Sequence, residues 1–589
     1  MNFDGYQSNY DREPCIRITG YENAAWEGYA SIAKEIKEAT ANLGSGRAVI
    51  TVECYPCVRE NEIIKNLDKM LPLTAIFRSD DAALAEQTIT EKARVFLTDD
   101  RVFGFLCPFD LKEFFCNERI ESMRRNVEAV EQGLILLIGF GASLISQGDI
   151  LIFANLARWE IQQRFRSGEM GNWRAGNQNE DVLKKYKRGF FLEWRMADRL
   201  KKSLYEKIDY LLDTNVKDNP KMVTGKAFLS GLSRAVTGPF RLVPYFDPGV
   251  WGGQWMKKVC GLNAECENYA WSFDGVPEEN SLYLQYGRVQ IEIPAIDVVL
   301  YKPIELLGKG VYARFGAEFP IRFDMLDTVG GGNLSLQVHP LTSYIQEKFG
   351  MFYTQDESYY ILDAGENSVV YLGLKEGIET EKMMIGLREA QAGGEPFQAE
   401  NYINAFPAKK HDHFSIPAGT VHCSGANTMV LEISATPYIF TFKLWDWGRL
   451  GLDGLPRPVH IDHGEKVIQW NRDTSWVRQN LLNLVEPVAS GDGWKEEKTG
   501  LHEAEFIETR RGWITKEAAW DTLGNVNVLN LVSGREAVVE SPSGAFEPFV
   551  LHYAETLIIP AAVGPYIIRP HGESLGQEIA VIKAYVRDV

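Results

Sequence analysis

The sequence predicts an amino-terminal α/β domain followed by a mostly-β region with a few helices. In residues 1–235, short apolar runs alternate with longer charged stretches of helical period, which indicates helices layered on a largely parallel sheet. A passage rich in glycine, proline and aromatic residues, 237–253, ends this pattern, and short strands separated by turns follow it. The chain has 589 residues, too many for one ordinary core, so we expect roughly two to four domains.

Three apolar runs predict the sheet of the amino-terminal domain. Ala48–Val52, Val95–Leu97 and Leu134–Ile138 are each expected to form a strand. The charged stretches Asn117–Gln132 and Asp181–Leu212 have the periodicity of helices. This order of elements is reminiscent of nucleotide or nucleoside kinases. We therefore expect residues 1–235 to have a degenerate kinase-like layout, of unknown role.

The turn after the first strong strand has no phosphate-binding loop. Residues 53–57 (ECYPC) stand where a kinase has a glycine-rich loop with a lysine, so nucleotide binding is not expected. Cys54 and Cys57 form a C-x-x-C pair, a spacing that can serve redox chemistry or half of a zinc site. Because no second C-x-x-C completes a four-sulfur site, we interpret both as structural thiols.

Composition and charge narrow the classes of partner. The chain has 62 basic and 80 acidic side chains, a formal net charge of -18, which argues against nucleic-acid or anionic-membrane binding. The longest strongly apolar stretch, residues 134–144, is too short to cross a bilayer, and no secretory signal is visible. Eight cysteines over this length do not make a disulfide scaffold. We therefore expect a cytoplasmic protein with no nucleic-acid or membrane partner.

Four potential metal ligands lie where histidine first appears. The first 338 residues contain no histidine; Gln337 and His339 then come close together, Glu357 follows, and His422 ends the run IPAGTVH. Residues two apart in a strand point to the same face, so Gln337 and His339 would project into one interior. Two imidazoles, a carboxylate and an amide oxygen suit zinc or a similar divalent ion. By spacing alone, Q-x-H is as readily an accidental pair of polar residues.

The Pro-Ala-Gly turn before His422 favours the metal site. It is typical of the strand-to-strand turn of a cupin, a small antiparallel double-sheet barrel whose interior commonly holds a metal. His411 and His413 flank Asp412 and are interpreted as turn or surface residues. The remaining histidines have no recognisable ligand pattern; these are His460, His463, His502, His552 and His571.

Seven short motifs lie in the second region of the chain. They are WGG (251–253), FPIRFDMLD (319–327), LSLQVHP (334–340), ESYYILDA (357–364), IPAGTVH (416–422), LEI (431–433) and PRPVHID (456–462). This ordered combination resembles the type I mannose-6-phosphate isomerases over roughly residues 240–589. The resemblance implies a metal-binding cupin catalytic domain in residues 240–465. It also implies one zinc ion per chain, or another divalent metal, held by the ligands Gln337, His339, Glu357 and His422.

The same resemblance implies an activity and the roles of three further residues. Members of the family interconvert mannose 6-phosphate and fructose 6-phosphate, an aldose-ketose isomerisation through a cis-enediolate that a bound metal stabilises. Glu432 matches the family carboxylate proposed for acid-base work. Lys443 falls where the family usually has an active-site arginine, and Ser335 matches the serine on the phosphate side.

Two departures from the family leave the substrate open. Asp324 and Gln355 stand where the family has lysines. The loss of two cations and the gain of an anion near a dianionic phosphate should weaken binding markedly unless other cations replace them. Arg322, Arg314 or Lys348 could substitute, although strand alternation does not separate Arg322 from Asp324.

Three hypotheses for function follow. The first is a zinc-dependent mannose-6-phosphate isomerase fused to an amino-terminal domain. The second is an isomerase of another sugar, including an unphosphorylated one, and the third is a noncatalytic sugar-binding cupin. Glu432 and Lys443 favour the two enzymes, whereas Asp324 and Gln355 favour the second and third hypotheses.

The last region, residues 466–589, opens with helical residues and returns to strands such as Val526–Val532 and Glu555–Ile559. Residues 554–564 (AETLIIPAAVG) echo the strand and Pro-Ala turn at 416–419, but no histidine follows the turn. The region resembles the second, metal-free cupin of the family. We expect it to serve a structural or dimer-forming role rather than to hold a second active site.

Overall fold

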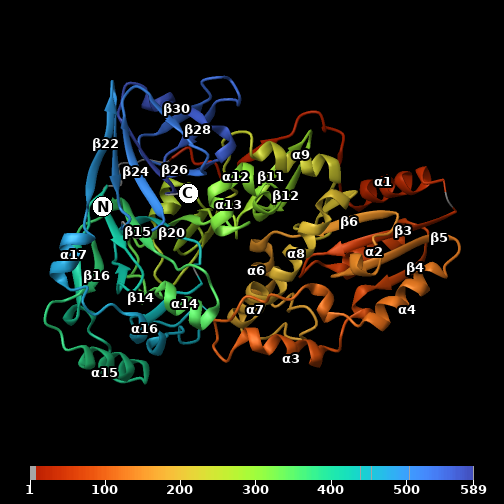
Figure 1. Cartoon of the computed structure of the whole chain (residues 1–589), viewed down its shortest axis with the longest axis horizontal. Coiled ribbons are helices and arrows are strands. Elements are labelled where there is room, and N and C mark those ends of the chain that lie inside the picture. The colour runs from red at the N-terminus through yellow and green to blue at the C-terminus, as the bar shows by residue number, and fades with distance from the viewer. Residues whose placement is uncertain (1–7, 45, 438, 453, 503–504, 588–589) are drawn as a thin grey trace. The chain divides into compact units, whose positions relative to one another are not determined.

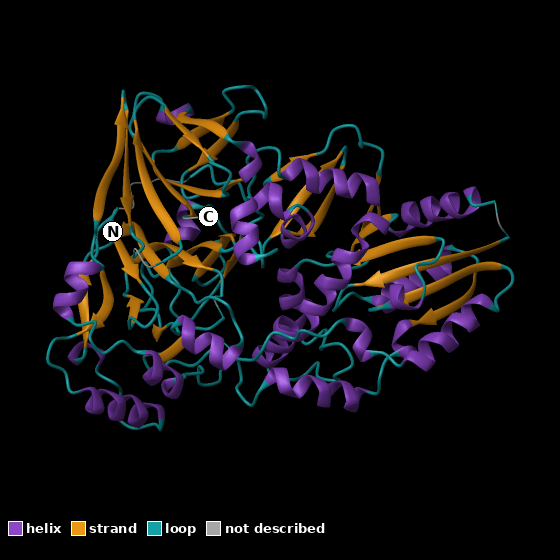
Figure 2. Cartoon of the chain, viewed as in Figure 1, coloured by secondary structure: helices purple, strands orange, loops and turns teal. Residues whose placement is uncertain are grey.

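The computed structural model, drawn in Figures 1 and 2, describes residues 8–587 except 45, 438, 453 and 503–504. These residues form two units. Unit 1 contains residues 8–14, 236–277 and 303–587, and unit 2 contains residues 15–235 and 278–302. A short segment from the middle of the chain therefore folds with the amino-terminal unit.

Unit 2 is built on a seven-stranded sheet with helices along it (Figure 2). Five neighbouring strands are parallel, and the last two are antiparallel. The inner strands are buried at almost every position, as a parallel sheet covered on both faces requires, whereas the edge strand β4 alternates. In spatial order the strands are β4 (Leu73–Arg78), β5 (Gly133–Gly139), β3 (Arg47–Cys54), β6 (Ile150–Asn155), β7 (Tyr210–Asp213), β8 (Lys221–Thr224) and β2 (Ala25–Glu27).

Two of the three strands predicted for this unit are confirmed. β3 and β5 contain the predicted runs 48–52 and 134–138. The predicted strand Val95–Leu97 is wrong, because these residues form the last turn of helix α3 (Glu86–Leu97). Ile89 and Ala93, four residues apart, are the buried positions of this helix, so its apolar face has helical spacing.

The long helix predicted for Asp181–Leu212 is only partly right. It is divided into α7 (Val182–Arg188), a π-helical turn (Gly189–Glu193) and α8 (Trp194–Leu204). The helix prediction is wrong for residues 210–212, because they belong to β7, which pairs in parallel with β6. The predicted helix at Asn117–Gln132 is confirmed as α4 (Asn117–Glu128), four residues shorter.

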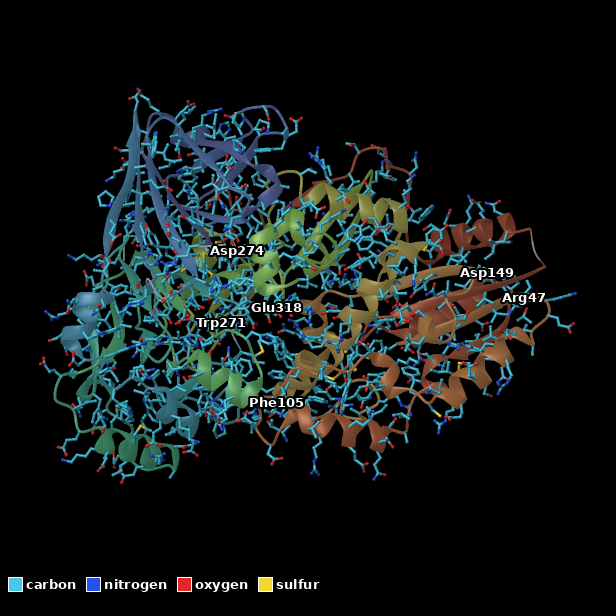
Figure 3. The ribbon with its side chains drawn as sticks, in the orientation of Figure 1. Arg47, Phe105, Asp149, Trp271, Asp274 and Glu318 are labelled. Atoms are coloured by element: carbon cyan, nitrogen blue, oxygen red, sulfur yellow. The ribbon has the colours of Figure 1, made fainter. Side chains whose placement is uncertain are left out.

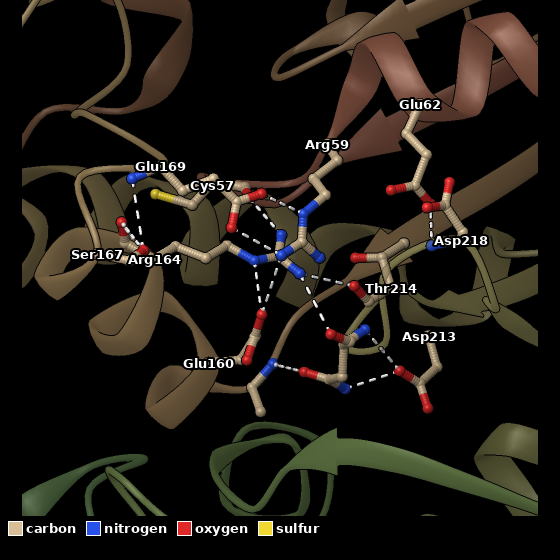
Figure 4. A network of polar contacts seen from close by, with 12 residues as sticks. Cys57, Arg59, Glu62, Glu160, Arg164, Ser167, Glu169, Asp213, Thr214 and Asp218 are labelled. Carbon is tan, nitrogen blue, oxygen red and sulfur yellow. Dashed lines mark hydrogen bonds and ion pairs between the residues drawn. The ribbon is translucent and has the colours of Figure 1, made fainter. Parts of the chain in front are cut away.

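The carboxyl ends of the parallel strands are tied together by polar contacts (Figure 4). The guanidinium of Arg164 donates to the carbonyl of Cys57 at 2.7 Å, the carbonyl of Thr214 at 2.8 Å and the carboxylate of Glu160 at 2.8 Å. At the opposite, amino-terminal ends of these strands, Arg47 donates to the carbonyl of Val130, and Asp149 accepts from the backbone N of Val49 (Figure 3 labels Arg47 and Asp149). Both ends of the sheet are therefore fixed by internal hydrogen bonds.

A buried carboxylate fills the backbone amide site that follows β5. Glu53 accepts from Gly141 N at 2.6 Å and from Ser143 N at 2.7 Å, and burial raises its pKa to about 7. Exposed amides at the carboxyl edge of such a sheet are the usual site for a ligand phosphate. Burial also raises the pKa of Cys54 and Cys57, which disfavours thiolate chemistry.

The described residues of unit 1 form four antiparallel sheets. Two of them carry the residues of the predicted site. The first consists of β18 (His413–Ile416), β15 (Glu357–Ala364), β20 (Thr428–Ala435), β13 (Ile321–Asp327), β10 (Trp271–Gly275) and β9 (Tyr245–Asp247). The second consists of β17 (Ile403–Pro407), β16 (Val369–Leu374), β19 (His422–Ser424), β14 (Leu336–Val338) and β21 (Phe442–Trp445).

The other two sheets belong to the carboxyl-terminal part of the chain. One consists of β22 (Val485–Gly491), β23 (Trp494–Thr499), β24 (Ile507–Ile514), β31 (Ile579–Val586), β26 (Asn527–Ser533) and β29 (Thr556–Ile559), and the other of β25 (Ala518–Asp521), β30 (Pro565–Pro570), β27 (Glu536–Glu540) and β28 (Phe549–His552). One apolar core contains Leu529 and Val581 from the first sheet and Val539 and Tyr566 from the second, so the two sheets pack face to face. β26 and β29 confirm the strands predicted there, and α16 (Ile461–Val467) and α17 (Thr474–Asn480) are helices near the predicted start.

Asp274, labelled in Figure 3, joins the two pairs of sheets within unit 1 through hydrogen bonds to Thr556. It lies on β10 and accepts hydrogen bonds from the backbone N and the hydroxyl of Thr556 on β29, at 3.2 and 3.0 Å. The hydroxyl of Tyr10 donates to the same carboxylate at 3.0 Å. Burial raises the pKa of Asp274 to about 6, and Arg241 opposes that rise.

Candidate metal centre and active site

The predicted ligands come together at the junction of β14, β15 and β19. Gln337 and His422 are direct partners in the β14–β19 register, and Glu357 is the first residue of β15. Glu357 Oε1 lies 2.5 Å from His422 Nε2, and Glu357 Oε2 lies 3.2 Å from His339 Nε2. Gln337 Nε2 lies 3.2 Å from His422 Nε2. All four side chains are buried.

The donor set fits a divalent cation. His339, Glu357 and His422 each offer a ligand atom, and these atoms lie within 4.8 Å of one another. Neither ring nitrogen of His339 makes a well-formed hydrogen bond to a described residue, an arrangement that is costly in a buried site without a ligand. His422 Nδ1 is 2.9 Å from the carbonyl of Thr420; donation there leaves a lone pair on Nε2, facing the cluster.

The charge state of Glu357 agrees with a ligand role. Burial by itself would raise the pKa of this carboxyl group, but the adjacent His339 and His422 rings lower it by more. Glu357 is therefore an anion between two imidazoles. A carboxylate and two imidazoles are among the ligands that zinc prefers.

Glu432 lies on β20, next to this cluster. Its Oε1 accepts from Arg322 Nη1 at 2.8 Å, from Ser434 Oγ at 3.0 Å and from Gln355 Nε2 at 3.2 Å. The same Gln355 nitrogen donates to Glu357 Oε2 at 3.2 Å, so one amide joins Glu432 to the ligand set. Burial, then the charges of Asp324 and Glu357, raise the pKa of Glu432 well above its usual range.

The two other predicted site residues lie on or beside the ligand-bearing sheet. Lys443 on β21 is the register partner of Gln337 and is half-buried. Ser335 is buried just before β14, and its hydroxyl donates to Asp446 Oδ1 at 2.9 Å. Asp446 also pairs with Arg449 and Arg457, each at 2.5 Å. The serine therefore borders a cluster of two arginines and one carboxylate.

Of the three cations considered as replacements for the lysines of the family, only Arg322 contacts the predicted acid-base residue. The guanidinium of Arg314 lies over the rings of Phe315 and Phe506, at 5.1 and 5.2 Å. Lys348 pairs with Glu347 on the surface. Arg322 contacts both Asp324 and Glu432.

Sequence reasoning missed the role of Ser434 and the pairing of Arg322 with Glu432. Ser434 follows Glu432 by two residues in β20, and the i, i+2 rule for strands was the signal that could have identified it. Arg322 and Asp324 have the same spacing in β13. Their alignment with Glu432 depends on the register of two strands that are distant in sequence.

The prediction that His413 is a turn or surface residue is wrong. It begins β18, is 1% exposed, and its Nε2 lies 2.9 Å from Ser358 Oγ. Its ring contacts that of Tyr360, at 5.2 Å, so apolar packing draws it inward. His411 does lie in the preceding turn, with a positive φ of 74°.

No helix among the described residues is both long and apolar enough to cross a membrane.

Two comparisons each match part of the chain. A family described as a domain of unknown function (DUF8485) matches residues 28–237. A mannose-6-phosphate isomerase of Streptococcus mutans is 26% identical over 258 residues, which are 43% of this chain and 76% of that protein. A probable mannose-6-phosphate isomerase of Bacillus subtilis, GmuF, is 24% identical over 235 residues, 40% of this chain and 69% of that protein. The predicted resemblance to these isomerases is confirmed for part of the chain.

Solved structures give matches of the same kind. The crystal structure of a mannose 6-phosphate isomerase from Bacillus subtilis is 19% identical, covers 59% of this chain and 100% of that chain, and has a TM-score of 0.48. A putative mannosephosphate isomerase from Archaeoglobus fulgidus is 17% identical, covers 60% of this chain and 98% of that chain, and has a TM-score of 0.44.

Proposed function

We propose that this chain is a metal-dependent aldose-ketose isomerase that interconverts mannose 6-phosphate and fructose 6-phosphate. The observation that carries the proposal is the buried cluster of His339, Glu357 and His422, joined through Gln355 to Glu432. A ligand set and a carboxylate of raised pKa in one buried site are what this reaction needs. The names of the curated relatives point to the same reaction.

Zinc, or a similar divalent ion, would be held by His339, Glu357 and His422, with Gln337 as fourth ligand. Bound there, it would supply a positive charge that stabilises the negative charge developing on the oxygens of the sugar. A half-turn of the Gln337 amide would present its oxygen, the better ligand, to the same point.

Glu432 would carry the proton. Its raised pKa makes the ionised carboxylate a stronger base, which suits a group that takes a proton from C2 of the open-chain sugar and returns it to C1 by way of a cis-enediolate. Burial of the surrounding strands would keep water from competing for that proton. Lys443 would provide a positive charge at the edge of the site, and Ser335 would lie toward the phosphate.

The two pairs of sheets in unit 1 support two cupins. In this proposal, a metal-binding cupin lies within residues 240–465, without the segment 278–302, and a metal-free cupin occupies residues 466–589. The α/β domain ahead of them, the cytoplasmic location and self-association through the second cupin stay predictions of the sequence.

A second candidate is an isomerase of an unphosphorylated sugar. It is favoured by the pairing of Arg322 with two carboxylates, Asp324 and Glu432, which largely balances the charge of the guanidinium. The family has a lysine at the position of Asp324. Assays on mannose 6-phosphate and on free mannose, with and without a chelator, distinguish the candidates. Chelator-sensitive turnover of the phosphorylated sugar supports the first, and turnover of free mannose alone supports the second. Sugar binding without turnover of either would mean a noncatalytic cupin.

A further inference from the structure

The hydrogen bonds to Glu432 are unevenly divided between its two oxygens. Arg322, Ser434 and Gln355 all donate to Oε1. Within the described part of the chain, Oε2 accepts no hydrogen bond from a protein donor. A carboxylate held by one oxygen has a defined orientation, and its other oxygen keeps its lone pairs for a reacting group.

Arg322 is the strongest of these three donors, because its hydrogen bond to Glu432 is charge-assisted. It is also fixed in place. Nη1 lies 3.1 Å from Asp324 Oδ1, and the guanidinium lies over the ring of Phe273, at 5.4 Å from the centroid. Its side chain is 7% exposed.

The strand register explains why this arrangement forms. Asp324 on β13 is the direct partner of Glu432 on β20, and Arg322 is the partner of Ser434. All four side chains are buried, and each strand places its two residues on one face. Two carboxylates directly opposite each other would repel, so the guanidinium between them is needed for the pair to be buried.

We propose that Arg322 is a positioning residue, which holds Glu432 by Oε1 and thereby directs Oε2 toward the sugar. Asp324 in turn holds Arg322. The inference rests on the proposed function and deepens it: Arg322 acts through Glu432 and does not bind the phosphate of the substrate. Its charge is shared between two carboxylates, and a dianionic phosphate would compete poorly for it.

The test uses the zinc-loaded full chain with Arg322→Lys, Arg322→Met and Asp324→Asn. The matched control is Lys583→Met, because Lys583 is a buried cation paired at 2.7 Å with the buried Glu496, on strands outside the site. Turnover is measured against substrate concentration and pH. Bound metal and circular dichroism are measured on every variant.

We expect Arg322→Met to lower kcat about 100-fold with KM changed less than about threefold, because orientation is lost and binding is not. Arg322→Lys should recover about tenfold of that loss, since it keeps the charge. Lys583→Met should leave both constants unchanged. A rise in KM with kcat retained would identify Arg322 as a substrate-binding residue and overturn the proposal.

The pH dependence of kcat distinguishes a positioning role of Arg322 from a merely structural one. The groups facing Glu432 from the neighbouring strands are Arg322 and Asp324 on β13 and Glu357 and Tyr359 on β15. Glu432 must be ionised to accept a proton, so the acidic limb of kcat follows its pKa. Arg322 lowers that pKa and Asp324 raises it. The limb should therefore move to higher pH in Arg322→Lys, whose single ammonium makes a weaker contact, and to lower pH in Asp324→Asn.

An infrared titration separates failure of this inference from failure of the proposed function. The protonated-carboxyl band of Glu432 is obtained as the difference between each protein and its Glu432→Gln counterpart, without any substrate. Opposite shifts in Arg322→Lys and Asp324→Asn would support the hydrogen-bonded arrangement even if the wild type isomerised neither sugar, in which case only the proposed function fails. Shifts in the same direction, or none, would overturn the positioning role. These two variants carry the test if Arg322→Met does not fold.

Discussion

His422→Ala should weaken metal binding strongly while leaving unit 1 folded. His422 is fully buried and forms the closest contact of the cluster, 2.5 Å to Glu357. Its removal takes away one of the two imidazoles and leaves His339, Glu357 and the weaker amide ligand Gln337. We expect the affinity for zinc to fall at least about 100-fold. The strands around the site are held by apolar side chains, so the fold should survive.

The size of the effect can be read from thermal stability. A 100-fold loss of affinity at a fixed, saturating zinc concentration removes about 2.7 kcal/mol of zinc-linked stabilisation. For a unit as large as unit 1, this loss of stabilisation lowers the zinc-dependent part of Tm by about 5 °C. The assay compares Tm with zinc and with chelator, together with zinc content by elemental analysis.

His552→Ala is the matched control. His552 is a histidine of unit 1 paired with a carboxylate, Glu555, at 3.0 Å, and it lies outside the cluster. This variant should keep about one zinc per chain and the full zinc-dependent rise in Tm. Full zinc occupancy in a His339→Ala, His422→Ala double variant would refute the assignment of the site.

Two further predictions concern other parts of the chain. Calorimetry with ATP and magnesium should detect neither tight binding nor phosphoryl transfer. Glu53 fills the amide site after β5, and no lysine-bearing glycine loop precedes α2 (Glu60–Met70). Tight, magnesium-dependent binding of ATP would contradict this prediction. Burial lowers the pKa of His413 to about 3 in the folded protein, below the ordinary value of 6.5. Between these two pH values the imidazole is protonated in the unfolded chain but not in the folded one. The free energy of unfolding therefore falls as the pH drops from about 6.5 toward 3. His413→Gln should flatten that fall in an acid-unfolding titration, and an unchanged slope would show that His413 is not its source.

The fold was predictable where one stretch of sequence contains its own signal. The runs at 48–52 and 134–138 are buried on both faces, and a continuous apolar run is what such strands need. Residues 95–97 are only three apolar positions, too few to distinguish a helical from a strand period. The 278–302 segment could not be assigned to unit 2, because β11 (Ser281–Tyr286) pairs in parallel with β1 (Cys15–Arg17), far away in sequence.

The features of the candidate site likewise fall into those that are local in the sequence and those that depend on contacts between distant segments. The ligand types and the turn before His422 are local features, and they indicated a metal site. The contact between Arg322 and Glu432 depends on the register of β13 with β20, which one sequence does not reveal. His413 was misplaced because a histidine beside a turn has no pattern that distinguishes a surface position from the first position of a buried strand.

The most direct test of the central claim is the interconversion of mannose 6-phosphate and fructose 6-phosphate by the zinc-loaded protein, measured beside its Glu432→Gln variant. The amide is isosteric with the carboxylate but cannot shuttle a proton. We predict chelator-sensitive isomerisation by the wild type and a loss of roughly 100-fold or more in kcat for the variant, with zinc content unchanged. Wild-type turnover that survives complete removal of the metal, or a Glu432→Gln variant as active as the wild type, would contradict the account.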